Sequence, residues 1–240
     1  MRNRLVGLVV AALALAAMPA SAQLAAKNAT PSGPVPHTAD GRPDLSGVWE
    51  IPYTPDMSKQ LGGQLPYLPW AEQNFKQYDP GNFDYTAHCL PAGWTRQMNT
   101  PMPIEIFQAP KRVAILFEAF SIYKVIPTDG REHRKDPEPS WMGDSVGKWE
   151  GDTLVIDTIG FNDKTRLDTI GHPHSTSLHV IDRLTRTDLG HLTYEVTIDD
   201  PKAYTKPWGN KRIFNLKPNW ELMEYSCEEN NKEVTEGHIK

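Results

Sequence analysis

The sequence lacks the features of several large classes of protein. Lys and Arg together (25) are fewer than Asp and Glu (30), which leaves no electrostatic basis for binding nucleic acid or an anionic membrane surface. Beyond residue 22, no apolar run approaches the length of about 18 residues that a membrane-spanning helix needs. No P-loop, Rossmann glycine fingerprint, G-x-S-x-G motif or solenoid-length repeat occurs. We therefore expect no nucleic-acid partner, no membrane insertion and no cofactor.

The N-terminal residues carry the three parts of a secretory signal. Two arginines precede an uncharged apolar stretch, Leu5–Met18, and a small-x-small pattern ends at Ala22. This order predicts a signal peptide over residues 1–22 that is cleaved before Gln23, and hence a protein of the periplasm or the extracellular medium. An uncleaved N-terminal anchor is the alternative, although the apolar stretch is short for one.

The only two cysteines, Cys89 and Cys227, lie in a chain that we expect to be exported. An oxidising compartment favours a single disulfide between them. That disulfide would close a loop of about 140 residues, which chain-entropy reasoning values at roughly 4–5 kcal/mol. The alternative is a catalytic thiol, although a free thiol outside the cytosol is readily oxidised.

Composition divides the mature chain into a lead-in, one domain and a tail. Residues 23–43 are rich in Ala, Thr, Ser, Pro and Gly without periodicity, which predicts a flexible lead-in. Residues 44–230 form the predicted domain, and residues 231–240 a C-terminal tail. After a first strand at residues 44–51, Pro and Gly punctuate the chain to about residue 99. A loop of that length in a compact domain usually covers or closes a site.

From residue 103 onward, apolar and polar residues alternate with the period of an antiparallel strand that has one wet face. The clearest case is residues 191–199, where Leu, Tyr, Val and Ile oppose Thr, Glu and Asp. Further strands are expected at residues 112–120, 153–158, 177–186, 211–216 and 220–227. The pattern predicts an all-β fold of about 8–10 strands, either an antiparallel barrel or a sandwich.

The residues Gly47-Val48-Trp49 resemble the G-x-W signature that opens the first strand of lipocalins and related calycin barrels. The glycine permits a sharp entry and the tryptophan plugs the closed end, so the resemblance implies an antiparallel, lipocalin-like barrel. The chain lacks the lipocalin T-D-Y element, and its loop after the first strand is longer.

Other segments are similar to a large group of exported bacterial proteins, most of which carry no assigned activity. This resemblance implies the fold and the compartment, but neither a reaction nor a substrate. The similar segments are residues 89–96, 143–154, 160–163, 173–175 and 178–180.

Three histidines, His172, His174 and His179, lie within eight residues. Such a cluster can bind copper or zinc, but its spacing matches no metal motif, and we expect no metal here. General acid–base catalysis by His179 or His174 is the better chemical use, because a carboxylate can orient an imidazole that titrates near neutrality. The plainer alternative is a loop histidine, a capping histidine and a strand histidine. The candidate carboxylate partners are Glu118, Asp157, Asp163 and Asp182.

Asp182 is the most informative of these carboxylates. It shares the apolar parity of its strand with Arg186, so both side chains enter the barrel if that face is the interior. The alternatives are an internal Asp182–Arg186 pair, or a register in which both face solvent. His179 and Arg183 lie on the opposite parity, so a regular strand cannot present both pairs to one cavity.

Aromatic and cationic side chains supply the candidate ligand contacts. Trp94 and Trp141 lie in loops, and Tyr194 lies on the apolar side of a strand. Loop aromatics can stack on a flat ligand, or they can pack a loop onto a barrel. Arg183 or Arg186 would hold an anionic group of the ligand.

The sequence therefore predicts an exported protein that binds a small, partly apolar organic molecule inside a β-barrel. The alternative is a cofactor-free lyase, isomerase or hydrolase that acts on such a molecule by His–carboxylate acid–base catalysis. A structural or interaction protein of the envelope is a third class, supported by the loop aromatics alone.

Overall fold

The computed structural model describes residues 29–229 and residue 231. The predicted signal peptide (1–22), the start of the predicted lead-in and nearly all of the predicted tail lie outside these residues. From Pro31 onward, the described residues belong to one compact unit. Within the described part of the chain, no helix is long and apolar enough to cross a membrane.

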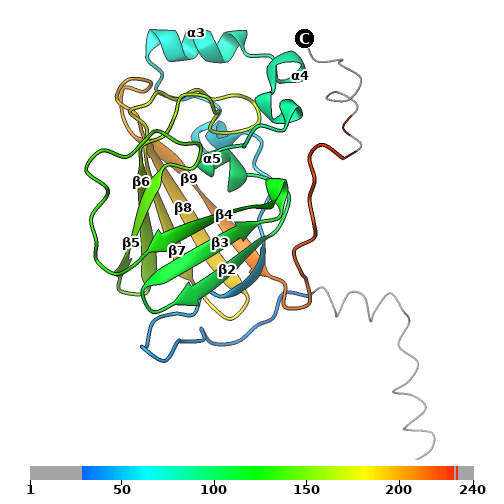
Figure 1. Cartoon of the computed structure of the whole chain (residues 1–240), viewed down its shortest axis with the longest axis vertical. Helices are drawn as coiled ribbons and strands as arrows, with labels where there is room; N and C mark the ends of the chain where they lie inside the picture. Colours follow the sequence, from blue (N-terminus) through cyan, green and yellow to red (C-terminus); the bar gives the residue numbers. More distant parts are fainter. Residues whose placement is uncertain (1–28, 230, 232–240) are drawn as a thin grey trace, which may run out of the picture. The chain divides into compact units, whose positions relative to one another are not determined.

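The fold is a nine-stranded antiparallel sheet that curls into a nearly closed barrel (Figure 1). The strand order is β4-β3-β2-β1-β9-β8-β7-β6-β5, so most neighbours in the sheet are also neighbours in the chain. The predicted all-β antiparallel barrel is thus confirmed. The strands are β1 (Gly47–Glu50), β2 (Ile104–Ala109), β3 (Arg112–Phe117), β4 (Ile122–Pro127), β5 (Asp144–Glu150), β6 (Thr153–Ile159), β7 (His179–Arg186), β8 (His191–Asp199) and β9 (Trp208–Leu216).

Alternation along each strand decides which side chains fill the barrel. On β7, Val180 and Leu184 are buried with Asp182 between them, while the odd-numbered residues are partly exposed, and β9 shows the same alternation. Burying each Leu, Ile or Phe in these inward rows contributes roughly 1.5–3 kcal/mol. A slip of one residue would turn every such side chain outward, so the apolar rows determine the register.

The first and last strands of the sheet, β4 and β5, meet at the seam of the barrel. Nζ of Lys124 on β4 donates to the carbonyl of Gly143, 2.7 Å away, just before β5. Gly147 on β5 lies so close to β4 that a Cβ there would stand 2.8 Å from Cγ2 of Thr128 and 3.0 Å from Cγ2 of Ile126. Only glycine fits at this point of the seam without moving a neighbour.

We expect Gly147→Ala to lower the free energy of unfolding by about 1–3 kcal/mol, because the added methyl overlaps β4. Urea denaturation followed by tryptophan fluorescence measures this loss. Adding Thr128→Ala removes the methyl that the new Cβ meets first, and the buried Thr128 hydroxyl has no hydrogen-bond partner to lose. The double variant should therefore regain part of the stability. Equal losses in both variants would mean that the seam is loosely packed here.

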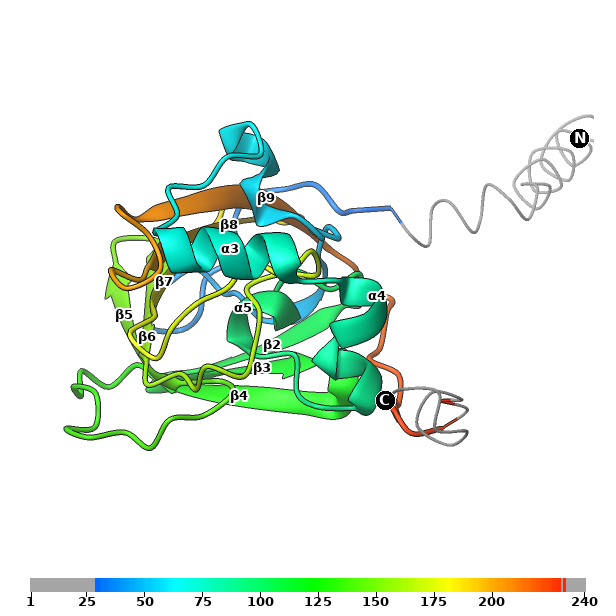
Figure 2. The same ribbon diagram turned by 90° about the horizontal axis from the view of Figure 1, so that it is seen from above.

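Residues 51–103, between β1 and β2, cover one end of the barrel, and we call this segment the lid. Figure 2 shows α3 (Pro69–Gln77) and α5 (Trp94–Gln97) over the barrel opening. The last helix of the lid, α5, enters the barrel, and all four of its residues are buried. The predicted long loop thus has helices of its own. The others are η1 (Met57–Leu61), α3 (Pro69–Gln77), α4 (Pro80–Phe83) and η2 (Tyr85–His88), and a further 3-10 helix, η3 (Ala119–Ser121), follows β3.

Trp49 and Arg186 close the end of the barrel opposite the lid. The Arg186 guanidinium carbon lies 5.0 Å from the centre of the Trp49 ring. All three guanidinium nitrogens donate to backbone carbonyls, those of Asp44, Asp188 and Leu189. Arg186, a predicted ligand contact, is thus fully engaged by the protein itself.

The second half of the predicted flexible lead-in is folded onto this closed end. The backbone N–H of Leu189 donates to the carbonyl of Gly33 at 2.9 Å, and the N–H of Asp44 donates to the carbonyl of Pro36 at 2.9 Å. Composition alone suggested flexibility because these residues have no periodicity, but the partner of Gly33 lies far along the chain, at Leu189.

The Cys89–Cys227 disulfide forms as predicted, with Cα atoms 5.5 Å apart, and it joins the lid to the segment that follows β9. The strand predicted at residues 220–227 is not formed. Because the sheet is already nearly closed, this segment lies beside it without joining a ladder. It is held instead by side chains, as where the N–H of Met223 donates to Oε2 of Glu118 at 2.9 Å.

Candidate functional site

A buried polar cluster lies inside the barrel, beneath α5. Asp182 is fully buried on β7. Its Oδ2 accepts a hydrogen bond from Nε1 of Trp94 (2.7 Å), and its Oδ1 accepts one from the hydroxyl of Tyr194 (2.5 Å). Burial raises the pKa of Asp182 to about 6, and the two hydrogen bonds limit the rise. Such a carboxyl changes charge near neutral pH, which suits a general acid or base.

Two cationic side chains lie on the aromatic members of this cluster. The Arg212 guanidinium carbon lies 4.6 Å from the centre of the Tyr194 ring, and Nζ of Lys124 lies 5.5 Å from the Trp94 ring. Burial lowers the pKa of Lys124 to about 7, although the negative charge of Asp182 opposes this shift. One carboxyl and two cationic side chains therefore share an interior in which electrostatic interactions are strong.

Several buried polar atoms of this interior have no hydrogen-bond partner in the protein. On β9, the inward-facing side chains of Trp208 (Nε1), Asn210 (Oδ1) and Arg212 (Nε and Nη2) contribute four of them. Gln97 of α5 contributes its Oε1. An unpartnered buried polar group costs about 1–3 kcal/mol. These groups lie under one end of the lid, where a water molecule or a ligand atom can be their partner.

The alternation of β7 places the site residues that we predicted on this strand on two opposite faces. Asp182 and Arg186 face inward, whereas His179 and Arg183 face outward. Nη2 of Arg183 donates to Oε2 of Glu150 at 3.0 Å on the outer surface. His179 therefore does not meet Asp182, and Asp182 accepts hydrogen bonds from aromatic side chains rather than from Arg186.

His172 belongs to a buried clamp that fastens the lid. Its Nδ1 lies 2.6 Å from Oδ2 of Asp168, and the same oxygen accepts the backbone N–H of Met57 at 2.8 Å. One ligand atom each of Asp56, Asp168 and His172 lies within 4.8 Å of the other two, which is close enough to hold a cation. However, Asp56 already caps η1 through the N–H of Ser58, and Asp168 already has several donors. We therefore assign this group to holding the lid.

His174 and His179 lie in unrelated surroundings. Nε2 of His174 is 2.6 Å from Oγ1 of Thr165, and burial lowers the pKa of His174. His179 lies on the outer face of β7, with its Nε2 2.9 Å from Oδ1 of Asp157. The three histidines that are close in sequence thus do not share one site.

The remaining predicted residues lie on separate parts of the surface. Glu118 accepts the N–H of Met223. Asp163 is exposed beside a hollow of about 320 Å³. The ring of Trp141 stacks on Tyr85, with ring centres 6.3 Å apart. The structure brings none of these three residues to Asp182.

A second polar cluster lies outside the barrel, where the loop after β4 meets β5, β6 and β7. Nε2 of His133 and Nε2 of His179 each lie 2.9 Å from Oδ1 of Asp157. Nδ1 of His133 lies 3.1 Å from Oδ2 of Asp144, and the other oxygen of Asp144 accepts from Nε of Arg134 at 2.7 Å. His179 thus has a carboxylate partner, Asp157, which is one of the four candidates.

Sequence reasoning missed Lys124, Arg212 and His133. Lys124 stands between two isoleucines on the apolar parity of β4, and Arg212 precedes Phe214 at two-residue spacing on β9. A charge on an apolar parity is the signal that singled out Asp182, so it could have found both cations. His133 lies in a loop, and nothing beside it in the sequence points to Asp157.

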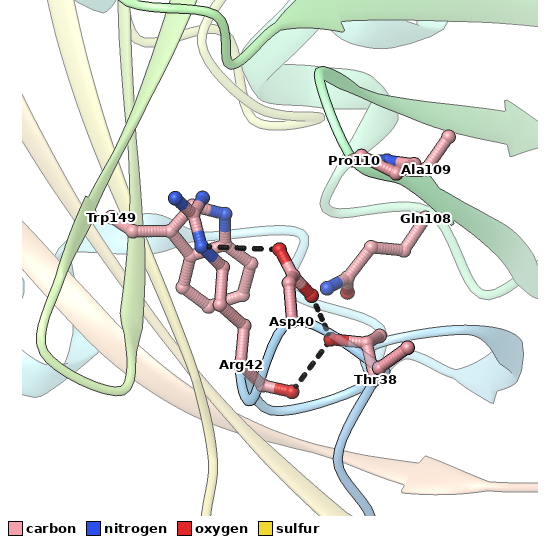
Figure 3. A pocket seen from close by; sticks show the side chains of 8 residues that line it. Thr38, Asp40, Arg42, Gln108, Ala109, Pro110 and Trp149 are labelled. Carbon is pink, nitrogen blue, oxygen red and sulfur yellow. Dashed lines mark hydrogen bonds and ion pairs between the residues drawn. The ribbon is translucent and has the colours of Figure 1, made fainter.

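A spacious hollow of about 450 Å³ lies at the end of the barrel opposite the lid (Figure 3). Arg42 lies over the ring of Trp149, 5.5 Å from its centre, and pairs with Asp40 at 3.5 Å. On the facing side, both ends of the Gln108 amide are hydrogen-bonded to backbone. Because these polar groups already have partners, the hollow is a weaker candidate for a ligand site than the barrel interior, where polar atoms are unpartnered.

No protein-family model matches this chain, and no curated protein or solved structure matches it significantly. The function is therefore argued from the geometry of the two polar clusters.

Proposed function

We propose that the protein is exported and that it binds a small, partly apolar organic molecule with an anionic group at the lid end of the barrel. The main support is Arg212, because its Nε and Nη2 are buried without a hydrogen-bond partner. These two nitrogens are the pair with which a guanidinium holds a carboxylate or sulfonate. The disulfide is consistent with an oxidising compartment.

The surroundings of Arg212 suit the apolar part of such a molecule. Tyr194 and Phe214 stack with ring centres 5.2 Å apart beside it, and Trp94 covers the cluster from the lid. Lys124, whose pKa is lowered to about 7, adds positive charge when it is protonated. An aromatic or alicyclic acid combines the two properties that these residues recognise.

Entry requires the lid to move, because α5 fills the barrel mouth. Nε1 of Trp94 donates to Asp182, and the side-chain amide of Gln97 donates to the carbonyl of Ala119. Further contacts also hold α5 and the residue after it, including the ion pair of Arg96 with Asp84 at 2.5 Å and the hydrogen bond from Nη1 of Arg212 to the carbonyl of Met98 at 3.1 Å, and entry must break them. In this proposal, α5 moves aside to admit the ligand and Trp94 then covers it, while Nε and Nη2 of Arg212 bind its anionic group.

We expect Arg212→Met to weaken the binding of anilinonaphthalene sulfonate roughly 10- to 100-fold, because charge-assisted hydrogen bonds to the sulfonate are lost. A fluorescence titration of the dye gives the Kd. The matched control is Arg183→Met, which removes an arginine from the outer face of the neighbouring barrel wall and should leave the Kd unchanged.

Near-ultraviolet circular dichroism verifies that both variants are folded, because a loosened core also binds this dye. Unchanged binding in Arg212→Met, or an equal loss in Arg183→Met, would contradict the proposed anchor.

Acid–base catalysis by this cluster is the second candidate function, a cofactor-free lyase, isomerase or hydrolase reaction. It is favoured by the pKa values of Asp182, about 6, and Lys124, about 7, which suit proton transfer near neutral pH. Chromatography of an aromatic or alicyclic acid, recovered after incubation with the protein, distinguishes the two functions. A binder returns the compound unchanged, whereas an enzyme returns a product that Asp182→Asn no longer forms.

A further inference from the structure

We propose that protonated His133 is a pH-sensitive latch, which fastens the loop between β4 and β5 to the outer wall of the barrel and releases it as the pH rises. The imidazole is held by Asp144, the first residue of β5, and by Asp157 on β6. This inference is independent of the function proposed for the interior, because the latch lies outside the barrel.

The loop between β4 and β5 has few other attachments along its middle part. From residue 129 to residue 139, its hydrogen bonds and ion pairs to the rest of the described chain come from His133 and Arg134 alone. All of them end on the same two carboxylates. His133 and Pro137 are the two residues of this stretch that are not exposed. A change at His133 therefore acts on the main polar attachment of the stretch.

Both ring nitrogens of His133 face carboxylate oxygens. Nδ1 lies 3.1 Å from Oδ2 of Asp144, and Nε2 lies 2.9 Å from Oδ1 of Asp157. Because ionised carboxylates only accept, both contacts are hydrogen bonds only when both nitrogens carry a hydrogen. A neutral imidazole has one N–H, and it would turn a lone pair toward one of the two negative oxygens. The observed arrangement therefore belongs to the imidazolium form.

The charged and titratable groups around His133 come from its own loop and from three strands. In the loop, Nε of Arg134 donates to the other oxygen of Asp144 at 2.7 Å. Burial raises the pKa of Asp144, but hydrogen bonds from Arg134 and His133 outweigh it and hold this pKa below its ordinary value. On β7, Nε2 of His179 lies 2.9 Å from Oδ1 of Asp157 and can donate to it as a neutral imidazole. One imidazolium, that of His133, thus joins two carboxylates.

The pH dependence of the latch follows from its burial and from the chemistry of histidine. The side chains of His133 and Asp144 are 21% and 13% exposed, so water screens their interaction less than that of an open surface pair. Histidine changes charge between about pH 5 and pH 8. The latch is therefore closed at the acidic end of this range and loses one of its two hydrogen bonds as the pH rises. The loop then keeps the ion pair of Arg134, whose side chain is 68% exposed.

The far end of the same loop has separate attachments. The N–H of Ser140 donates to the carbonyl of Gly160 at 3.0 Å, and the carbonyl of Trp141 accepts the N–H of Trp94 at 3.3 Å. Neither contact involves a titratable group. We therefore expect a rise in pH to free residues 129–139 and to leave the contact between the loop and α5 in place.

Limited trypsin digestion tests the latch, because the loop exposes three cleavage sites, Arg131, Arg134 and Lys135. Wild type and His133→Gln are compared at the same pH, so that the pH dependence of trypsin cancels, and mass spectrometry locates the cuts. We expect the loop of the variant to be cut at least about 5-fold faster than that of the wild type at pH 6, and within about twofold of it at pH 8.5. Asp157→Asn, which removes the acceptor of Nε2, should resemble His133→Gln at pH 6.

The control variant is His191→Gln, which removes another partly exposed imidazole beside a carboxylate, Asp188, 2.9 Å away. Its loop should be cut at the wild-type rate at both pH values. The latch is overturned if wild type and His133→Gln are cut alike at pH 6, or if the difference between them is as large at pH 8.5. Circular dichroism verifies the fold of each variant.

Discussion

Replacing both cysteines, as Cys89→Ser/Cys227→Ser, is expected to lower the free energy of unfolding by roughly 4–5 kcal/mol. The disulfide joins residues 138 positions apart, so its loss returns much conformational freedom to the unfolded chain. Since a domain is typically stable by only about 5–15 kcal/mol, this is the largest single effect that we expect. Urea denaturation at pH 7, followed by tryptophan fluorescence, measures it.

The wild type in the presence of a reductant is the control, and its denaturation midpoint should match that of the double variant. Limited proteolysis should then cut first in the segment after β9, which belongs to no strand of the sheet. A loss below about 1 kcal/mol would contradict the chain-entropy argument, and would mean that the unfolded chain is already compact around this link.

Asp182 is expected to make the barrel less stable as the pH rises from about 4 to about 6. Its pKa in the folded protein is about 6 against an ordinary 3.8, so folding favours the protonated carboxyl. The stability that this group contributes is fully present below pH 3.8 and is lost as the pH rises through 6. The difference between these two pKa values corresponds to roughly 3 kcal/mol, at about 1.36 kcal/mol per pKa unit.

The comparison of wild type with Asp182→Asn isolates this effect, because the other titrating groups are common to both proteins. The difference between their unfolding free energies should change by about 2–2.5 kcal/mol between pH 4 and pH 7, with the wild type losing relative to the variant. Asp163→Asn, at an exposed carboxyl, should run parallel to the wild type. Parallel curves for Asp182→Asn as well would show that Asp182 keeps an ordinary affinity for its proton.

The strands could be predicted because alternation is a local property. On β8, the predicted residues 191–199 are the observed strand, and the burial pattern of β7 follows the parity that put Asp182 inside and His179 outside. The segment at residues 220–227 was also predicted as a strand, although its alternation is broken at Leu222 and Met223, and it forms none. A strand also needs a neighbouring edge, and alternation says nothing about which edges are free.

The candidate site was predictable only where one strand carried the information. The parity of β7 marks Asp182 as an interior carboxyl, and the same rule applied to β4 and β9 marks Lys124 and Arg212. The hydrogen bond from Trp94 to Asp182 joins residues 88 positions apart, so no local pattern contains it. For the same reason, the sequence offered four carboxylates for His179 and no basis for preferring Asp157.

By itself, the sequence determined an all-β chain with strands of known parity; it favoured one disulfide, and it put Asp182 inside the fold only if the apolar face of its strand is the interior. These follow from the two-residue period of a strand and from the presence of only two cysteines. The tertiary structure alone decided that α5 fills one end, that Arg186 closes the other, and that His133 and His179 face one carboxylate oxygen. Such contacts depend on how a closed sheet places distant strands and loops beside one another, and that placement is a property of the whole chain.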